Sequence, residues 1–355
     1  MKAAVMREFG GPDVLHLEEV ADPRPAPGEA LVRVAAVSVN NLDLRLREGD
    51  YYRRPGLPHV LGWDPSGVVV ATGSGVSQLT TGQRVVFKGR IRCGHCAACT
   101  AGRQQNCEHS EQLGLDRWGA YAEYISVPES NLRPFPAGLS FAEATVIFRH
   151  FPQALTLLEE SAGLRAGEWL LVMGAAGALG SCLCQVGKLL GASVIAAAGT
   201  DERAAACLAY GADFAVNYRA RDLAAEVMAI TDGHGVDVLT ENIGDPAIWP
   251  GAFASLARKG RLVTVGAHGG GVVPLDLHQL YLKHIKIIGT AGSRPEDAAR
   301  TAQLAASGQI RAVIGATLPL TEAAQAHRLA QARGVIGKVV LVPSPAEAGA
   351  GATGS

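Results

Sequence analysis

The sequence predicts a mixed α/β protein, with a β-rich unit followed by a doubly wound parallel sheet. Up to about residue 130, short apolar runs such as ALVRVAAVSV and SGVVVATG are separated by turn residues, a pattern typical of strands. Beyond Pro136, near-continuous apolar strands alternate with helical segments, which indicates a parallel sheet covered on both faces. The length of 355 residues suits about two such domains.

The change of pattern sets the expected domain boundaries. We expect the β-rich unit over residues 1–136, the parallel-sheet unit over 137–290, and a C-terminal return to the first unit over 291–343. Residues 295–333 are predicted to be mainly helical, with GKVVLV as a closing strand. The remaining residues, 344–355, are small and polar and are expected to form a flexible tail.

Composition and charge narrow the classes of function. Hydrophobic residues make up 48% of the chain and charged residues 18%, which suits a protein with a sizeable core. The 32 basic and 33 acidic residues leave a formal charge of −1, which argues against nucleic acid or an anionic membrane as the main partner. No apolar run approaches the roughly 20 residues of a membrane span, and the sequence begins without a signal-peptide pattern. We therefore expect a cytoplasmic protein that acts on a small-molecule substrate.

Glycine is the compositional outlier, with 43 copies among 355 residues against a usual share of about 7%. Three of them, Gly174, Gly177 and Gly180, begin at the last residue of the apolar run LLVMG and lead into a helix. The first allows a tight turn, the second lets the backbone approach a pyrophosphate, and the third lets helix and strand pack closely. With Ala178 and Leu179 at the helix N-terminus, which attracts phosphates, they predict a dinucleotide-binding turn. An ordinary strand–helix turn with glycines for packing is the alternative.

The end of the next strand indicates which dinucleotide is bound. Enzymes that use NAD usually place an acidic residue there, but Asp201 and Glu202 come too late in this chain. Thr200, Arg203 and Tyr218 offer hydroxyls and a cation, which suit a 2′-phosphate. The sequence therefore favours NADPH, with NADH possible. In the alternative, Arg203 is a solvated helix residue and cofactor selectivity is loose.

Four cysteines at short spacings form the second motif. Cys93, Cys96, Cys99 and Cys107 lie in a segment rich in glycine and polar residues, over about residues 90–110. Four thiolates close a tetrahedron around Zn²⁺ and leave no open position, so the predicted zinc is structural. Free or redox-active thiols are the alternative. The other three cysteines are expected to be packing residues: Cys182, Cys184 and Cys207.

The order of these motifs resembles the medium-chain dehydrogenase/reductase superfamily, which includes zinc alcohol dehydrogenases and quinone or enone reductases. The resemblance rests on the β-rich unit, the four-cysteine lobe, GAAGALG and GKVVLV, and it covers residues 1–343. It implies a GroES-like catalytic domain and a Rossmann cofactor domain, with the active site in the cleft. It also implies a homodimer or homotetramer, for which IKIIGTAG is the candidate edge strand.

The chain departs from that family's zinc alcohol dehydrogenases at their catalytic zinc. Those enzymes use a cysteine, then the histidine and glutamate of a G-H-E motif, and a further cysteine or aspartate. The matching positions here are Asn40, then Trp63 and Asp64, and finally Arg149 or His150. Asparagine and tryptophan cannot replace cysteine and histidine at a zinc centre. We therefore expect the structural zinc lobe to be kept and the catalytic zinc to be lost.

The zinc-free branch of the superfamily reduces activated acceptors, namely quinones, α,β-unsaturated carbonyls or enoyl thioesters. SVNNLD resembles the quinone-reductase motif V-N-x-x-D, with Asn40 and Asp43 at its polar positions. Asn40 either donates a hydrogen bond to the developing oxyanion or caps the following helix. Trp63 either walls the substrate pocket or is an ordinary core aromatic.

Arg149 and His150 replace the threonine or tyrosine often found at this point in quinone reductases. Either side chain is a candidate to hold a carboxylate, a thioester carbonyl or an enolate, and His150 is a candidate proton donor. An arginine–acid pair, or a histidine that fixes the domain boundary, is the structural alternative.

The family pattern also implies further cofactor contacts at strand ends and near the C-terminus, at Asn242, Gly266, Ala267, Gly292 and Lys338. The leading expectation is an NADPH-dependent reductase with one structural zinc ion. The alternatives are a zinc-type alcohol dehydrogenase with an atypical site, and a non-catalytic NADPH-binding redox sensor.

Overall fold

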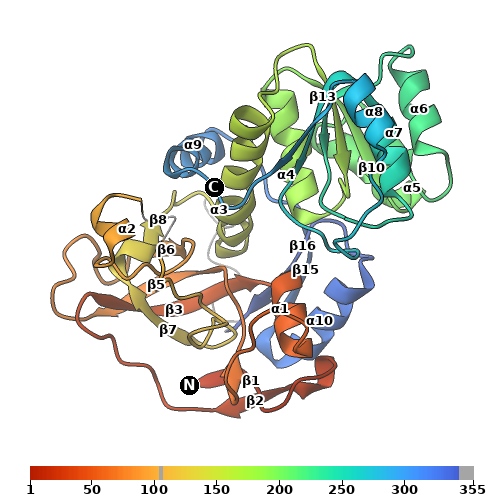
Figure 1. The fold of residues 1–355 in the computed structure, drawn as a ribbon. Coiled ribbons are helices and arrows are strands. Elements are labelled where there is room, and N and C mark those ends of the chain that lie inside the picture. The colour runs from red at the N-terminus through yellow and green to blue at the C-terminus, as the bar shows by residue number, and fades with distance from the viewer. Residues whose placement is uncertain (104–106, 344–355) are drawn as a thin grey trace, which may run out of the picture. The chain divides into compact units, whose positions relative to one another are not determined.

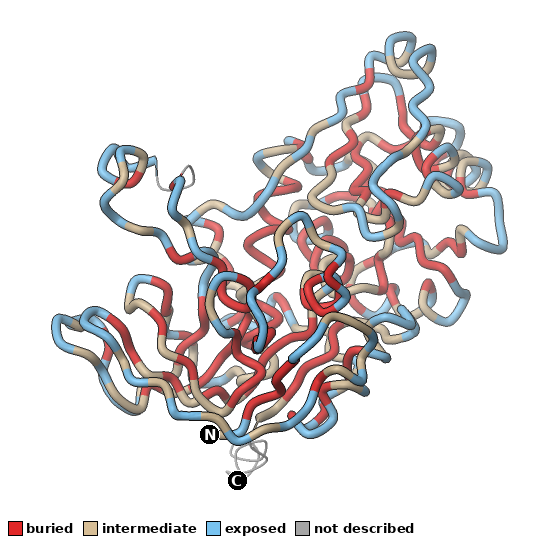
Figure 2. The backbone as a smooth tube through the Cα atoms, turned by 60° about the horizontal axis from the view of Figure 1, so that its bottom comes forward, coloured by how far each residue is buried: buried red, intermediate tan, exposed pale blue. Residues whose placement is uncertain are grey.

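The computed structural model describes residues 1–103 and 107–343 and divides them into two compact units. Unit 1 comprises Met1–Arg149 together with the described residues from Ile314 onward, and unit 2 comprises His150–Val313. Buried stretches follow the strands of each unit, and exposed loops separate them (Figure 2). The predicted flexible tail lies outside the described residues.

The division differs from the boundaries expected at 136/137 and 290/291. The first boundary falls inside α3 (Phe141–Leu155), because the first turns of this helix pack on unit 1, where Phe141 and Phe148 contact buried Phe135. The second boundary lies beyond α9 (Pro295–Ala306), which belongs to unit 2. A helix that spans a boundary has one continuous amphipathic pattern, so its sequence does not mark the division.

Unit 1 contains two sheets (Figure 1). The smaller has the order β2 (Leu15–Glu19), β1 (Lys2–Met6) and β4 (His59–Val60), with antiparallel pairing. The larger has the order β15 (Ile314–Pro319), β16 (Lys338–Val342), β3 (Glu29–Ser38), β5 (Pro65–Thr72), β6 (Arg84–Phe87) and β8 (Leu132–Pro134), and β7 (Tyr124–Pro128) pairs with β3. Two helices of this unit are α1 (Asn41–Glu48) and α10 (Ala323–Ala332).

Residues 295–333 are mainly helical, as predicted, but the sequence did not indicate strand β15. The segment contains α9 and α10, but β15 lies between them and pairs in parallel with β16. Its residues IGATLP alternate between half-buried and exposed positions, a short pattern that two flanking helices obscure in the sequence. The closing strand GKVVLV is confirmed as β16.

Unit 2 is built on one six-stranded parallel sheet with α4 (Ala178–Leu189) among its covering helices (Figure 1). Its strand order is β11 (Phe214–Asn217), β10 (Ser193–Ala198), β9 (Trp169–Met173), β12 (Val236–Thr240), β13 (Leu256–Thr264) and β14 (Lys286–Gly289). Counted within the unit this is 3-2-1-4-5-6, the doubly wound order. The order reverses between β9 and β12, where such sheets bind ligands at the carboxyl ends of the strands.

Alternate residues of β9 face opposite layers of helix. Leu171 and Met173 pack in one core cluster with residues of α6 (Leu223–Ile230) and α7 (Trp249–Ala254). Leu170 points the other way, and a Cβ on Gly187 of α4 would lie only 2.6 Å from its Cδ2. Both faces of the sheet are therefore buried, as the continuous apolar strands predict.

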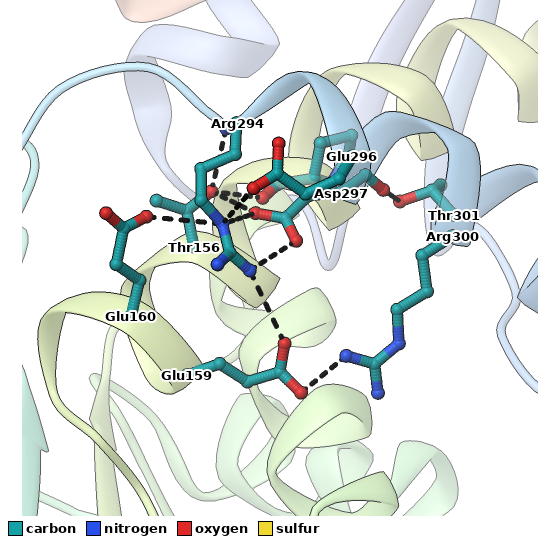
Figure 3. A network of polar contacts seen from close by, with 9 residues as sticks. Thr156, Glu159, Glu160, Arg294, Glu296, Asp297, Arg300 and Thr301 are labelled. Carbon is teal, nitrogen blue, oxygen red and sulfur yellow. Dashed lines mark hydrogen bonds and ion pairs between the residues drawn. The ribbon is translucent and has the colours of Figure 1, made fainter.

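A charged cluster holds α9 to the π-helical turn Thr156–Ser161 that follows α3 (Figure 3). Arg294, which precedes α9, donates through Nε and Nη2 to the two oxygens of buried Asp297, at 2.8 and 2.7 Å. Thr156 Oγ1 donates to the same carboxylate at 2.5 Å. Glu159 pairs with both Arg294 and Arg300. Buried hydrogen bonds to a charged group are among the stronger polar interactions, so this cluster fixes the end of unit 2.

Among the described residues, no helix is long and apolar enough to cross a membrane.

Candidate active site and metal centre

The glycine turn of unit 2 has the geometry that its sequence predicts. Gly174 directly follows β9 with φ +64°, a conformation that side chains disfavour. A Cβ on Gly180 would lie 2.3 Å from Gly174 O and 2.6 Å from the Cα of Ala175, so only glycine allows this contact between turn and helix. Gly177 is the N-cap of α4, and a Cβ there would approach Gly174 O at 3.3 Å.

The N-terminus of α4 lies at the point where the strand order reverses. Ala178 and Leu179 are the first residues of the helix, and the first N–H groups of a helix have no intrahelical acceptor. A Cβ on Gly174 would lie 3.7 Å from Ile243, so the loop after β12 passes beside the turn. This arrangement fits a pyrophosphate, which helix N-termini bind through unpaired N–H groups and the helix dipole.

The predicted contacts on neighbouring strands gather at the same edge of the sheet. Asn242 Oδ1 accepts from the N–H of Val265, and the N–H of His268 donates to Asn242 O, so the loops after β12 and β13 are joined. Gly266 and Ala267 lie in the second of these loops. Gly292 follows β14 with φ +80°. Whether these residues contact a cofactor remains a prediction from their positions.

Of the three residues predicted beside the end of β10, Thr200 and Tyr218 lie there. Thr200 caps α5 (Asp201–Ala206) by accepting from the N–H of Arg203 at 3.3 Å. The guanidinium of Arg203 acts on Cys207: burial raises the pKa of this thiol, and the charge of Arg203 offsets part of the rise. Tyr218 does approach the end of β10, since its hydroxyl lies 3.3 Å from a Cβ built on Gly199.

Arg219, which the sequence did not indicate, also lies beside the end of β10. Its Nε lies 3.4 Å from a Cβ built on Gly199, next to Tyr218. Asn217 holds this segment, because its Oδ1 accepts from the N–H of Arg219 while its Nδ2 donates to Asp201 Oδ1 at 3.2 Å. The position of Arg219 directly after Tyr218 was the signal available in the sequence.

The four lobe cysteines converge in unit 1. Their sulfur atoms all lie within 4.8 Å of one another, and Cys93 Sγ is 3.6 Å from Cys107 Sγ and 3.9 Å from Cys99 Sγ. A tetrahedron with Zn–S bonds of about 2.3 Å has edges of about 3.8 Å, so the four positions fit a zinc ion. Backbone N–H groups of the lobe, above all that of Cys99, lower the pKa of Cys96 to about 6, which favours the thiolate. Within the described residues, no other group of three or more His, Cys, Asp or Glu side chains has this geometry.

A second cluster of unit 1 gathers the residues at the positions of the family's catalytic zinc ligands. Strand β3 lies between β5 and β16, and its antiparallel registers place Ser38 opposite Asp64 on one side and Asn40 opposite Lys338 on the other. Asn40 Nδ2 donates to Asp64 Oδ2 at 2.9 Å, and Ser38 Oγ donates to the same oxygen at 3.3 Å. Lys338 Nζ donates to Asn40 Oδ1.

Both the oxygen and the nitrogen of the Asn40 side-chain amide have hydrogen-bond partners. Its oxygen faces Lys338, and its Nδ2 also lies 3.3 Å from Ser38 Oγ and 3.4 Å from Ser38 O. Asn40 is the N-cap residue of α1 and forms a capping box with Asp43, and its Nδ2 also donates to Asp64. The predicted oxyanion contact of Asn40 therefore requires one of these bonds to be exchanged. The ammonium of Lys338 has three N–H donors, so its bond to Asn40 does not by itself prevent the expected cofactor contact.

Arg149 completes the cluster from α3. Thr145 Oγ1 donates to Asp64 O, and Arg149 lies four residues later on the same helix face. Its Nε is 3.3 Å from Asp64 Oδ2, and its Cζ lies 5.3 Å from the centre of the Trp63 ring. The structure thus brings Asn40, Trp63, Asp64 and Arg149 together. His150 is buried and is the first residue of unit 2.

Asp43 lies behind this cluster and cannot contact a substrate, since it is 1% exposed. Its two oxygens accept from the N–H groups of Asn40, at 2.8 Å, and Gly62, at 3.1 Å, and so brace both segments of the site. Burial raises the pKa of Asp43 to about 6, and the charge of Asp64 adds to the rise. The hydroxyl of Tyr121 also binds Asp43. The structure therefore indicates a positioning role for Asp43.

A buried chain of polar groups continues from Tyr121. His327 of α10 lies 3.1 Å from the Tyr121 hydroxyl through Nε2 and 3.1 Å from Arg47 Nη1 through Nδ1. An arginine only donates, so Nδ1 accepts and the proton of the neutral ring is on Nε2. Burial lowers the pKa of His327 to about 3, and the charge of Arg47 lowers it further. The sequence offered no motif around these residues.

Comparison with known proteins agrees with this organisation. The profile "Alcohol dehydrogenase GroES-like domain" matches residues 26–137, and "Zinc-binding dehydrogenase" matches residues 178–307. An alcohol dehydrogenase of Geobacillus stearothermophilus is 32% identical over 88% of this chain and 91% of its own. The chain belongs to the medium-chain dehydrogenase/reductase superfamily. It is an oxidoreductase of this nicotinamide-dependent superfamily, with a GroES-like domain and a Rossmann-like domain.

The superfamily members similar to this chain include both quinone oxidoreductases and alcohol dehydrogenases. A quinone oxidoreductase of Rattus norvegicus is 29% identical over 96% of this chain and 98% of its own. A crystal structure of an NAD-dependent alcohol dehydrogenase superimposes with a TM-score of 0.90 and 36% identity, over 97% of this chain and 100% of its own. Similarity to the superfamily therefore does not identify the acceptor.

Proposed function

We propose that the protein is an NADPH-dependent reductase that transfers hydride to an activated acceptor without a catalytic zinc ion. The acceptor class is a quinone, an α,β-unsaturated carbonyl or an enoyl thioester. The observation that carries this proposal is the Asp64 cluster. Catalytic zinc takes three protein ligands from cysteine, histidine and carboxylate. The matching positions offer at most two such side chains, Asp64 and His150, and the carboxylate of Asp64 faces Asn40 and Arg149.

The atoms and electrons of the proposed reaction balance without a metal ion. Bound NADPH would supply the hydride for the electrophilic carbon of the acceptor, whose oxygen would gain the displaced electron pair and then a proton from water. The N-terminus of α4 would hold the pyrophosphate of the dinucleotide. In unit 1, the side chains beside Asp64 would orient the acceptor.

Turnover with a neutral quinone tests the proposal. We expect NADPH oxidation with 1,2-naphthoquinone by protein that contains one zinc ion per chain, and no oxidation of simple alcohols, because no Lewis acid lowers the alcohol pKa. Initial rates at 340 nm and metal analysis measure both. Two zinc ions per chain with alcohol oxidation would establish the zinc-type alternative. Tight NADPH binding without turnover of a quinone, an enone or crotonyl-CoA would establish the redox sensor.

The proposed preference for NADPH rests on Tyr218 and Arg219 beside Gly199. Replacing Arg219 with alanine should raise the KM for NADPH about tenfold or more and leave that for NADH within about twofold, because a charge-assisted hydrogen bond is worth about 1.5–3 kcal/mol. Arg221→Ala is the matched control, since Arg221 is equally exposed to solvent and pairs with Glu226 at 3.5 Å. An unchanged ratio of the two KM values in Arg219→Ala would remove Arg219 from cofactor selection.

We also propose a homodimer or homotetramer that assembles through β14. This strand is the edge of the six-stranded sheet, and its Ile287 is 41% exposed. The preceding helix α8 (Leu277–Leu282) exposes Leu277, Tyr281 and Leu282. An edge strand beside exposed apolar side chains favours pairing with a second copy. The molar mass in solution, measured by light scattering, tests this assembly.

A further inference from the structure

We propose that the acceptor carries a carboxylate or similar oxyanion and that Arg149 binds it, with the Trp63 ring as one wall. This inference rests on the proposed reductase function and narrows its substrate class. The Arg149 guanidinium of unit 1 is held between α3 and Asp64, and its Nε makes no hydrogen bond within the described part of the chain.

The N–H groups of Arg149 have no hydrogen-bond acceptor among the described residues. Its Nε is buried and lies 3.3 Å from Asp64 Oδ2, within ion-pair distance, but the angle does not make a hydrogen bond. The side chain is 33% exposed, so the other end of the guanidinium reaches solvent. Arg261 of unit 2 differs, because it donates to Glu168 and to three backbone carbonyls.

Asp64 contacts the guanidinium of Arg149 through Nε. The same carboxylate oxygen already accepts from Asn40 Nδ2 at 2.9 Å and Ser38 Oγ at 3.3 Å. One oxygen of Asp64 thus contacts three side chains, and among the described residues it contacts the guanidinium at Nε, which orients Arg149. An orienting contact on Nε leaves the two Nη groups for a ligand.

The remaining N–H groups suit a planar oxyanion. A guanidinium presents parallel N–H donors in a fixed fork that matches two oxygens of a carboxylate. The Trp63 ring lies 5.3 Å from Cζ of Arg149 and is itself half-buried, so it holds the guanidinium plane and offers a flat apolar wall. An acceptor with a conjugated apolar body and an anionic group fits both features.

A pair of quinones that differ in one charged group tests the inference. We would measure kcat/KM with 1,2-naphthoquinone and with its 4-sulfonate, using the zinc-loaded protein and saturating NADPH. The ratio of the two values in each variant cancels the intrinsic reactivity of the quinones. Arg149→Met should lower the sulfonate-to-neutral ratio about tenfold or more, and Arg149→Lys should lower it less, because it keeps the charge and loses the fork.

Arg24→Met is the control, because it removes one positive charge from an exposed position of unit 1 and should leave the ratio unchanged. An equal loss for both quinones in Arg149→Met would overturn the inference, since Arg149 would then act on the reacting carbonyl or on the fold. An unchanged ratio would overturn it as well.

A binding measurement separates this inference from the proposed function. We expect 1-naphthalenesulfonate to quench tryptophan fluorescence of the NADPH complex at lower concentration than naphthalene, and Arg149→Lys to weaken that preference at least threefold. The preference should also decrease with added salt. Absent turnover with both quinones would refute the reductase function, whereas equal binding of the charged and neutral naphthalenes would refute the oxyanion site.

Discussion

Replacing Cys99 with serine should remove the zinc ion from the lobe and open the segment between Ile91 and Glu111. Cys99 is buried and provides one of four sulfurs whose separations fit a zinc tetrahedron. The described part of the lobe has one short α-helix, Ala97–Thr100, and closes through the paired N–H and C=O groups of Ile91 and Glu111. The apparent free energy of zinc binding in small zinc modules is about 10–16 kcal/mol, which greatly exceeds the stabilising free energy of these backbone contacts.

The measurements are metal content and limited proteolysis. The zinc content should decrease from about one ion per chain to near zero, and trypsin should cleave after Arg92 or Arg103 at least tenfold faster. The far-ultraviolet circular dichroism should change little, because the sheets of both units lie outside the lobe. Cys184→Ala is the control: this cysteine is buried in α4, far along the chain from the lobe, and its loss should leave the zinc content at one. A Cys99→Ser protein that retains its zinc would contradict the four-sulfur site.

The second large effect is expected at the glycine turn. Gly180→Ala should weaken NADPH binding about a hundredfold or more, because the new Cβ would lie 2.3 Å from Gly174 O and 2.6 Å from Cα of Ala175. Both neighbours are backbone atoms, so α4 must move away from β9 to make room. A displacement of this size takes the first N–H groups of α4 out of reach of the pyrophosphate.

Fluorescence titration with NADPH measures this effect. Gly251→Ala is the matched control in unit 2, since a Cβ on that glycine meets only Leu223 at 3.7 Å, an ordinary contact. Its NADPH affinity should stay within about threefold of the unchanged protein. Thermal unfolding of both variants distinguishes loss of the turn from loss of the fold. An affinity of Gly180→Ala equal to that of the control would exclude the turn as the phosphate site.

Much of the fold and of the candidate site follows from local sequence patterns. Apolar strands that alternate with helices predicted the parallel sheet, and the spacing of Gly174, Gly177 and Gly180 predicted the turn. Strand β15 was missed because six residues between two helices carry too weak a period. The expected boundaries missed the division inside α3 because the amphipathic pattern of a helix continues through it.

Two contacts became visible only in the tertiary structure. Arg219 lies beside Gly199, while the cofactor contact of Arg203 stays a prediction. Lys338 Nζ contacts Asn40 beside the pairing of β16 with β3, and its cofactor contact also stays a prediction. In both cases the contacted residue follows a different strand, and the sequence of a single segment does not show which strands are paired.

The sequence by itself determined the residues whose partners are close in the chain: the zinc lobe, whose four cysteines span fifteen residues, and the glycine turn, which joins one strand to one helix. Short loops restrict such groups to few geometries, so spacing alone is informative. Only the tertiary structure determined which side chains contact Arg149. Its contacts with Asp64 and Trp63 cross more than eighty residues of chain, and they depend on the packing of α3 against β5 in unit 1.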